Sequence, residues 1–405
     1  MQLSIGKLQG AANCRFVATS TRISLSSGIE ANCLPDMGDC HVKRVNSNVL
    51  GRMCGREKAS LRSSAIAVLI CAGILSTTAS VALADESGTS FWLPGTYGSL
   101  AAVPGTPGWA VASVYYHTSV SAGADVAAAR EIQIGRFNPS LSVNLNASLH
   151  ATADLAIIVP SYTFATPVLG GQLAVQMGTI TGTTSANVNG TLTASLPPFG
   201  LVRTDSISNT TTGFGDLYPL ASLKWNMGVN NFMTYITGDI PVGNYSSTSI
   251  SNLGLGHGAI DGGGGYTYFN PATGHEFSAV AGFTYNFINP TTQYQSGVDF
   301  HLDWGASQFL SKQFFVGLVG YAYDQVSADS GSGDKVGAFE SRVFSVGPQL
   351  GYIFPIAGKQ GFLGLKSYFE FDAKDRPEGW NTWLTFAISD AAPTPSAAPP
   401  PLVHK

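Results

Sequence analysis

Asp299, His301 and Asp303 are three ionisable residues that alternate along one short segment. In a β-strand, residues two apart project from the same face at about 7 Å, so these side chains would form one polar row. A metal site would also need ligands from neighbouring elements. We interpret the row as polar residues facing a hydrated interior. A metal or proton-linked site is the alternative, and we predict no metal or cofactor.

A second alternating group begins at Lys366 and continues through Tyr368, Glu370 and Asp372, opposite an apolar face that includes Phe369 and Phe371. If the segment crosses a bilayer, a Lys facing lipid at the midplane would cost about 2–4 kcal/mol. The charged side chains should therefore point inward. We predict that Lys366, Tyr368 and Glu370 line a substrate path together with Asp299, His301 and Asp303.

Hydrolysis by a serine nucleophile is the enzymatic alternative that we considered for these residue types. A serine nucleophile needs a base within hydrogen-bond reach and a third group that orients the base. The Asp-x-His-x-Asp segment supplies no serine, and the sequence contains no nucleophile elbow. Histidines after residue 84 are His117, His150, His257, His275, His301 and His404. We predict that the protein is not an enzyme.

Four consecutive glycines, Gly262–Gly265, are not a phosphate-binding loop, because no Lys-Ser/Thr and no helix follow them. Glycines inside a strand indicate either a kink or a close approach of other groups to the backbone. A kink here could open a lateral gap in the wall, through which apolar substrates could leave.

The elements that must carry these residues are β-strands. Polarity alternates clearly in five segments: 141–150, 217–227, 276–287, 299–307 and 362–372. Further expected strands are 109–118, 154–166, 170–183, 231–243, 258–269, 313–325, 339–354 and 379–389. Single-chain bacterial barrels have an even number of strands. We therefore predict 12 strands from these 13 segments, with 14 as the alternative.

Composition favours a membrane barrel over a soluble β-sandwich or solenoid. Only 11% of residues are charged, whereas globular domains have about 25%. The polar face of the strands consists mostly of Ser, Thr, Asn, Gly and Tyr. No stretch after Leu75 is long enough for a membrane helix, so a membrane protein of this sequence must close an all-β, antiparallel transmembrane barrel.

Turn residues separate the expected strands. Short turns at 270–274 and 310–313 should lie on the periplasmic side. Longer polar stretches at 184–214, 244–257, 289–296 and 327–338 should form extracellular loops.

An export signal precedes the strands. Arg56, Lys58 and Arg62 lead into an apolar run at 65–75, and a small-residue cleavage site ends at Ala84. We predict a signal peptide at 53–84, and a start at Met53 that makes residues 1–52 a mis-assigned upstream extension. The apolar run is too short for a membrane anchor, and the bulky Ile70 argues against lipidation of Cys71.

All five cysteines precede residue 72, so the exported chain would have no disulfide or thiol nucleophile. Residues 85–405 contain 21 acidic and 12 basic side chains, a net charge near −9. Nucleic-acid binding depends on clustered Lys and Arg. We therefore predict no nucleic-acid partner.

Residues 85–108 should be irregular, because Pro-Gly pairs follow Phe91, Trp92 and Leu93. This segment either plugs the lumen, where it would give apolar compounds a foothold, or is a solvated lead-in to the barrel at 109–389. The last expected strand is rich in aromatic residues, as barrel assembly machinery requires. A Pro- and Ala-rich tail at 390–405 should be disordered.

Several stretches resemble the outer-membrane family named after the MetA-pathway of phenol degradation, whose members are described as transporters. They are Gly213–Asp216, Ile260–Tyr266, Asn270–Ser278, Tyr294–Trp304 and Val346–Tyr352. The resemblance covers most of residues 90–389 and is most specific after residue 213. It implies a barrel similar to long-chain fatty-acid and toluene channels, which takes up aromatic or other hydrophobic compounds.

Together these features predict an outer-membrane channel for passive uptake of small hydrophobic or aromatic compounds through a polar-lined barrel. Its expected partners are outer-membrane lipid, the apolar ligand and the barrel assembly machinery. The alternative is a structural or adhesive surface barrel whose extracellular loops bind a partner.

Overall fold

The computed structural model describes residues 90–123, 144–196, 199–334 and 340–391, and three short strands nearer the N-terminus. Those strands, β1 (Ile23–Leu25), β2 (Ile29–Asn32) and β3 (His41–Arg44), form a small antiparallel sheet in a unit of their own. The expected signal peptide, most of the expected upstream extension and the tail after residue 391 lie outside the described residues.

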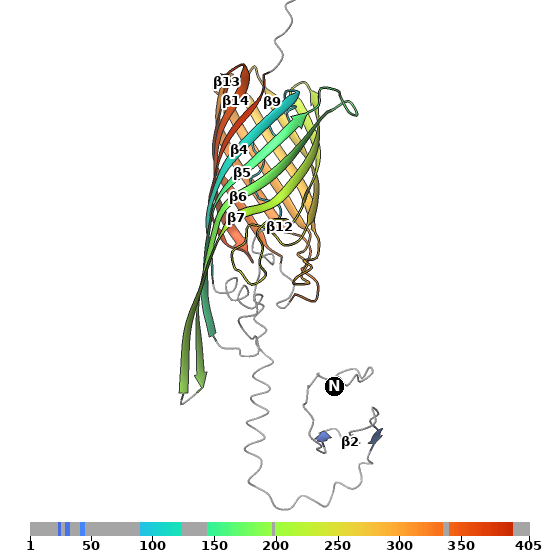
Figure 1. Ribbon diagram of the computed structural model, residues 1–405, viewed down its shortest axis with the longest axis vertical. Helices are drawn as coiled ribbons and strands as arrows, with labels where there is room; N and C mark the ends of the chain where they lie inside the picture. Colours follow the sequence, from blue (N-terminus) through green and yellow to red (C-terminus); the bar gives the residue numbers. More distant parts are fainter. Residues whose placement is uncertain are drawn as a thin grey trace, which may run out of the picture. The chain divides into compact units, whose positions relative to one another are not determined.

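Twelve antiparallel strands close into a barrel, as the sequence predicts (Figure 1). β15 pairs with β4 and completes the cylinder. The strands are β4 (Gly108–Ala122), β5 (Asn144–Thr163), β6 (Gln172–Leu196), β7 (Phe199–Met227), β8 (Asn230–Asp239), β9 (Ala259–Asn270), β10 (His275–Asn286), β11 (Asp299–Phe309), β12 (Phe314–Gln325), β13 (Arg342–Ile356), β14 (Lys359–Lys374) and β15 (Glu378–Asp390). No helix among the described residues is long and apolar enough to span a membrane.

Thirteen expected segments become twelve strands because two of them are one strand. The segments 141–150 and 154–166 both fall largely within β5. Residues Ala151 to Ala153 pair with β6 without interruption, so no turn separates the two halves. No Gly or Pro lies between the two segments, so a break there had no support from turn-forming residues.

The expectation that residues 184–214 form a loop is wrong, because the described residues among them belong to β6 and β7. These residues extend β6 and β7 into a long hairpin that runs past the rim of the barrel (Figure 1). On its outer face, Thr183 bonds Thr212 at 2.8 Å and Ser185 bonds Thr210 at 3.0 Å between hydroxyl oxygens. Thr is polar but favours strands, because its branched side chain suits a pleated surface.

The short turns at 270–274 and 310–313 occur as expected, between β9 and β10 and between β11 and β12. Gly274 has a φ of 74° and its N–H donates to the Asn270 carbonyl, a backbone conformation that suits glycine. The stretches 244–257 and 289–296 connect strands at the opposite end, as does the described part of 327–338.

The glycine run does not kink β9. Gly262–Gly265 pair with β8 and β10 in unbroken register. A Cβ on Gly263 would lie 2.6 Å from the Tyr235 hydroxyl oxygen, and one on Gly282 would lie 2.8 Å from Nε2 of His301. The glycines therefore allow two ring side chains to lie flat on the sheet, and the expected lateral gap has no support at this position.

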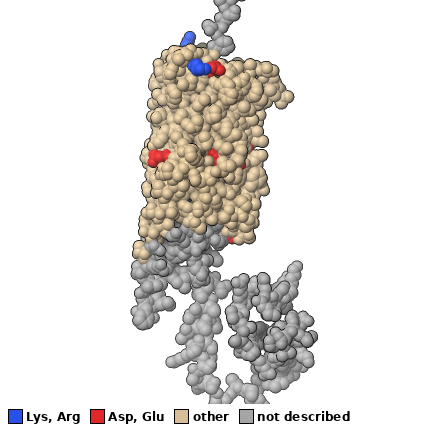
Figure 2. Space-filling model, viewed as in Figure 1, with Lys and Arg blue, Asp and Glu red and all other residues tan. Residues whose placement is uncertain are grey.

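The two faces of β11 and β14 are as the alternation predicts. Asp299, His301 and Asp303 are fully buried on the inner face, whereas the Phe369 and Phe371 side chains are about half exposed on the outer face. Figure 2 shows that few charged side chains reach the outer surface in this view. Asp372 is an exception to the predicted inward group, because it lies at a bulge, is largely exposed and pairs with Arg342 at 3.1 Å.

We expect the outer surface of the barrel to face lipid at Phe369 in β14, and the outer face of the projecting β6–β7 hairpin to face water. A nitroxide label on Phe369→Cys should be accessible to oxygen and protected from water-soluble relaxation agents. A label on Thr210→Cys, which is exposed on the outer face of the hairpin, should show the opposite. Accessibility measured by electron paramagnetic resonance would contradict this assignment if both labels reported lipid.

Candidate functional site

Residues 90–107, here called the lumen segment, lie inside the barrel and are held by charged side chains of its wall. The Asp303 carboxylate accepts the backbone N–H of Gly95 at 2.8 Å and of Tyr97 at 3.0 Å. Lys366 donates from Nζ to the Gly95 carbonyl at 2.6 Å, and the Tyr368 hydroxyl is 3.3 Å from the same oxygen. Asp303 thus binds N–H groups of this short stretch of backbone, and Lys366 binds a carbonyl group of the same stretch.

Further along the segment the same arrangement recurs. Glu276 accepts the Leu100 N–H at 2.9 Å and the Ser99 hydroxyl at 2.5 Å. Lys224 donates from Nζ to the Ala101 carbonyl at 2.7 Å. Buried charges need such partners, because an unsatisfied charge inside a protein is costly. The segment therefore supplies hydrogen bonds that the inner wall would otherwise lack.

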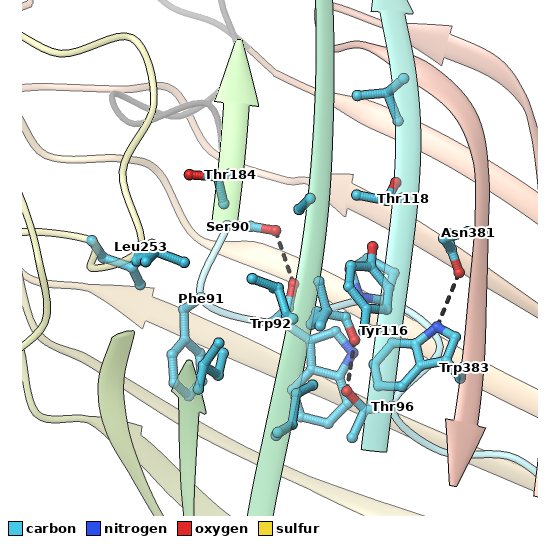
Figure 3. A pocket seen from close by; sticks show the side chains of 18 of the residues that line it. Ser90, Phe91, Trp92, Thr96, Tyr116, Thr118, Thr184, Leu253, Asn381 and Trp383 are labelled. Carbon is cyan, nitrogen blue, oxygen red and sulfur yellow. Dashed lines mark hydrogen bonds between the residues drawn. The ribbon is translucent and has the colours of Figure 1, made fainter. Parts of the chain in front are cut away.

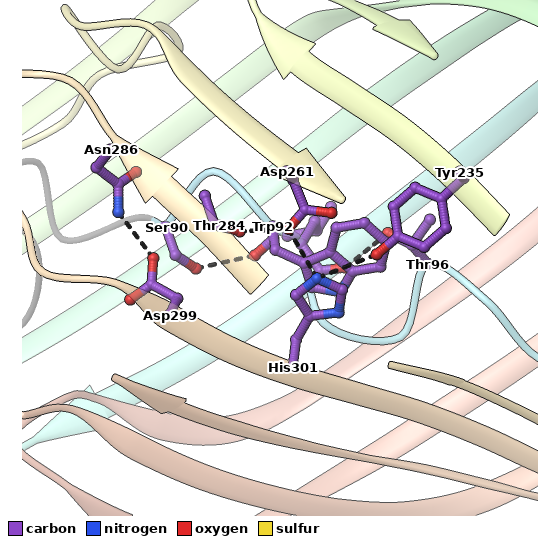
Figure 4. A network of polar contacts seen from close by, with 10 residues as sticks. Ser90, Trp92, Thr96, Tyr235, Asp261, Thr284, Asn286, Asp299 and His301 are labelled. Atoms are coloured by element: carbon purple, nitrogen blue, oxygen red, sulfur yellow. Dashed lines mark hydrogen bonds and ion pairs between the residues drawn. The ribbon is translucent and has the colours of Figure 1, made fainter. Parts of the chain in front are cut away.

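Trp92 anchors the beginning of the segment on a histidine (Figure 4). Its ring stacks on His301 with centroids 3.7 Å apart and an angle of 11° between the planes. Nε2 of His301 lies 2.8 Å from the Asp261 carboxylate and 3.3 Å from the Tyr235 hydroxyl. Asp261 also accepts the Thr284 hydroxyl at 2.6 Å. The buried contact between His301 and Asp261 thus holds in place the imidazole ring that stacks on Trp92.

Tyr97 continues this aromatic contact. Its ring lies 5.8 Å from Trp92 and 6.0 Å from Tyr235, between centroids. Burial raises the pKa of the Tyr97 hydroxyl, and the nearby Asp303 and Asp261 raise it further. Tyr97 therefore remains neutral and does not add charge to the lumen.

The row Asp299, His301 and Asp303 does not converge on a common point. Asp299 accepts from the Asn286 amide at 2.9 Å, His301 contacts Asp261, and Asp303 binds the lumen segment. Among the described residues, no group of three or more His, Cys, Asp or Glu side chains could hold a metal ion. The residues are buried against neighbours, whereas the sequence suggested a hydrated face.

A cavity of about 480 Å³ lies between the start of the lumen segment and one side of the barrel (Figure 3). Its wall comes mainly from β4, β5, β6 and β15, and the 250–255 loop and Arg376 border it at the long-connection end. The principal apolar and aromatic lining residues are Phe91, Leu93, Val114, Tyr116, Leu149, Leu155, Ile157, Ile180, Tyr218, Leu253, Leu255 and Trp383. We call the inner faces of β4, β5 and β6 the apolar wall.

The apolar wall corrects the expectation of a polar-lined barrel for this side of the lumen. Tyr116 is 5% exposed and Leu155 is 8% exposed on the inner face. On the outer face, Asp154 accepts the Tyr115 hydroxyl at 2.6 Å and lies 2.7 Å from Nδ1 of His117. Polarity is therefore inverted here relative to β11. The outer polar groups lie beside Trp380, and an aromatic residue is typical of the edge of a membrane-facing band.

One side of the cavity carries a connected set of polar groups. The Trp383 indole donates to Asn381 at 3.0 Å, and the Asn381 amide donates to the Tyr321 hydroxyl at 2.9 Å. Tyr321 in turn donates to Glu370 at 2.6 Å. These groups satisfy one another, so this side of the cavity is polar but preorganised.

The structure brings only part of the predicted substrate path together. Phe91, Trp92, Lys366 and Glu370 line the cavity. Asp299, His301 and Asp303 belong to another wall, and Tyr368 contacts the backbone of the lumen segment. Sequence reasoning missed Tyr116, Leu155, Leu253 and Trp383. Tyr116, Leu155 and Trp383 lie in expected strands, but only closure of the barrel decides which face of each strand is inside.

We expect Asp303→Asn to loosen the lumen segment without unfolding the barrel. An amide cannot accept both N–H groups as the carboxylate does, and a hydrogen bond to a charged group contributes about 1.5–3 kcal/mol. Hydrogen exchange at the Gly95 and Tyr97 amides should therefore accelerate roughly ten- to hundredfold. Asp154→Asn, on the outer face, is the matched control. Unchanged exchange in Asp303→Asn would show that this carboxylate does not hold the segment.

The chain is similar to one protein family and to proteins of known structure. The profile of the family described as "Putative MetA-pathway of phenol degradation" matches residues 107–386. No curated protein matches the sequence. A crystal structure of an outer membrane channel from Pseudomonas putida F1 is 15% identical, with 74% of this chain and 100% of that chain covered and a TM-score of 0.51. A Pseudomonas aeruginosa FadL homologue is 10% identical, with 69% and 89% covered and a TM-score of 0.33.

The profile match spans the whole barrel from the end of the lumen segment to the last strand. The channel from Pseudomonas putida F1 has the same fold over its full length. The chain therefore belongs to the MetA-pathway of phenol degradation family, and its fold is that of outer membrane β-barrel channels.

Proposed function

We propose that this protein is an outer-membrane channel through which small hydrophobic or aromatic compounds diffuse passively. The observation that carries the proposal is the cavity between the apolar wall and the lumen segment. Ligand pockets commonly have volumes of about 300–1,000 Å³ and mostly apolar linings with a few placed polar groups. The cavity has both properties.

The side chains around the cavity favour aromatic ligands. Phe91, Tyr116, Tyr218 and Trp383 present rings to it, and aromatic pairs gain about 0.5–1.5 kcal/mol beyond the burial of their area. Removal of apolar surface from water adds roughly 25 cal/mol per Å². A compound with an apolar ring and at most one polar group therefore suits the cavity, and family membership supports the same class of ligand.

The direction of transport follows from the two ends of the barrel. Bacterial barrels place short turns in the periplasm and longer connections outside the cell. The cavity borders the 250–255 loop and Arg376, at the end with the longer connections. We infer that ligand enters from outside, and that the lumen segment must move before it passes to the periplasm. No catalytic step is needed for this function.

An adhesive surface barrel is the second candidate, because the β6–β7 hairpin projects beyond the rim. Its outer face is rich in Thr and Ser, which can bind a polar partner. Removal of the part of the hairpin beyond Thr184 and Thr211 separates the two functions. An adhesin would lose surface binding, whereas a channel would retain uptake.

A substitution that fills the cavity should reduce uptake. Ala153 lies on the inner face of β5 and lines the cavity, whereas Ala156 lies on the outer face of the same strand. We expect Ala153→Phe to lower uptake of a labelled naphthalene-sized compound several-fold in cells, because the added ring occupies the site. Ala156→Phe should leave uptake unchanged. Equal uptake by the two variants would exclude the cavity as the route.

Movement of the lumen segment can be tested by removal and by tethering. Deletion of residues 87–100 should preserve assembly and heat-modifiable gel mobility, because the described residues among them, 90–100, form no part of the strands. Single-channel conductance should rise, and selective uptake of the apolar compound should fall.

The tether uses Ser99 and Ser307, whose hydroxyl oxygens are 2.8 Å apart. A disulfide between Ser99→Cys and Ser307→Cys should reduce uptake when oxidised and restore it on reduction, and each single-cysteine variant is the control. If neither deletion nor tethering changes conductance or uptake, the segment is only a lead-in to β4.

A further inference from the structure

The cavity and a groove on the outside of the barrel meet at the same three residues. This groove, here called the outer groove, lies mainly on the outer face of β5 to β9, where Met177 and Ile236 contribute exposed apolar side chains. Gln176, Leu220 and Thr237 line both the outer groove and the cavity. At this position, therefore, only these parts of β6, β7 and β8 separate the cavity from the membrane-facing surface.

Apolar groups continue from the cavity to the outer groove. On the inside, Val159 and Ile180 line the nearby part of the cavity. On the outside, Trp109, Ile260 and Phe287 line the groove and are exposed. Removal of apolar surface from water is favourable at both positions. A compound that passed from one to the other would therefore remain among apolar groups.

The backbone pairing of β7 with β8 is incomplete where the cavity and the groove meet. In the described strands, this pairing ends at Leu220 and Thr237 and resumes only at an isolated bridge between Leu217 and Ile240. Pro219 lies in the interruption and has no N–H group to donate. Its carbonyl oxygen accepts the Thr237 hydroxyl at 2.8 Å. A hydrogen bond from a side chain therefore supplements the incomplete backbone ladder.

A second interruption lies on the other side of β6. The pairing of β5 with β6 passes from the pair Ile158–Thr179 to the pair Ser161–Gln176, and it omits Pro160 and the residue before it. β6 and β7 themselves pair without a break over residues 172–179 of β6. This stretch of two strands is bordered by an incomplete ladder toward β5 and another toward β8. It can therefore shift as a unit.

A comparable interruption in β13 lies in different surroundings. The pairing of β13 with β14 omits Pro348 in the same way. There the lumen segment lies against the inner face, because the Tyr368 hydroxyl oxygen is 3.3 Å from the Gly95 carbonyl oxygen. Pro348 lines neither the cavity nor the outer groove. The interruption at Pro219 differs, because the cavity lies on one side of it and the groove on the other.

We propose that an apolar compound leaves the cavity sideways, through the wall between β7 and β8 at Pro219, and enters the hydrocarbon part of the membrane by way of the outer groove. This step requires the hydrogen bond from Thr237 to Pro219 to break and the Leu220 side chain to move. The lumen segment can stay in place, whereas it must move for passage along the barrel axis. The proposal rests on the proposed function, to which it adds an exit.

Uptake through the wall can be measured when the axial path is closed. The oxidised Ser99→Cys/Ser307→Cys tether holds the lumen segment, so we expect cells with this variant to retain part of their uptake of radiolabelled naphthalene. Pro219→Val adds an N–H group opposite Gly238 that can complete the ladder, and it should lower the retained uptake several-fold. Pro348→Val makes the same replacement beside the lumen segment and should leave the retained uptake unchanged.

A disulfide between Leu220→Cys and Thr237→Cys closes the same place in the absence of the tether, and it replaces Pro219→Val if that variant does not assemble. Leu217 and Ile240 exchange both backbone hydrogen bonds, and hydrogen-bonded and non-hydrogen-bonded pairs alternate along an antiparallel ladder. Leu220 and Thr237 therefore form a close, non-hydrogen-bonded pair that a disulfide can join. Uptake should fall when the disulfide forms and recover on reduction, and the single-cysteine variants are the controls.

The outcomes separate the exit through the wall from the proposed function itself. If the tether alone abolishes uptake, or if Pro219→Val and Pro348→Val retain equal uptake, the exit through the wall is wrong and passage along the axis stands. The same conclusion follows if oxidation of the Leu220→Cys/Thr237→Cys pair leaves uptake unchanged. If Ala153→Phe also fails to lower uptake, the cavity is not the route and both proposals are wrong.

Discussion

The requirement that every backbone N–H and C=O within a bilayer find a partner governs this molecule. Lipid offers no hydrogen bonds, so a spanning sheet must have no free edge. The pairing of β15 with β4 removes the last two edges and makes an open sheet into a cylinder. Closure also creates an inner surface that is shielded from both lipid and bulk water. The chemistry of the protein depends on what fills that interior.

Charged side chains on this inner surface have few partners within the strands themselves. Asp303, Glu276, Lys366 and Lys224 obtain theirs from the backbone of residues 95–101, which would otherwise be unsatisfied in the same interior. The charged side chains of the wall and the backbone groups of the lumen segment therefore form hydrogen bonds with each other, which offsets the cost of burying both. This mutual dependence positions Phe91 and Trp92 and leaves the cavity on the side where the wall is apolar.

Glycines of β9 and β10, on the side of the barrel opposite the cavity, determine how close to the sheet the neighbouring rings can lie. Because Gly263 and Gly282 have no side chains, Tyr235 and His301 can lie against the sheet and present a flat ring to Trp92. A larger residue at either position would push these rings toward the barrel axis. The glycine run thus acts through packing of the lumen segment, and the wall itself remains continuous.

The class of fold, the even number of strands and the inner and outer faces of β11 could all be predicted from the amino-acid sequence. Alternation has a period of two and the bilayer excludes open edges, so these features follow from local pattern and solvent. The sequence also indicated that Phe91 and Trp92 precede the barrel in an irregular segment. It misassigned residues 184–214, because strand-forming Thr residues and loop residues share the same polarity.

The inner face of β4 and β5 could be identified only in the closed barrel, where Tyr116 and Leu155 line a cavity and Asp154 lies outside. Alternation distinguishes the two faces of a strand but does not say which of them is inside, and the usual rule that the inner face is polar fails at Tyr116 and Leu155. The partners of Asp303, more than 200 residues away in the chain, were equally out of reach. Closure of the barrel brings such residues together, and no local pattern encodes a contact over that separation.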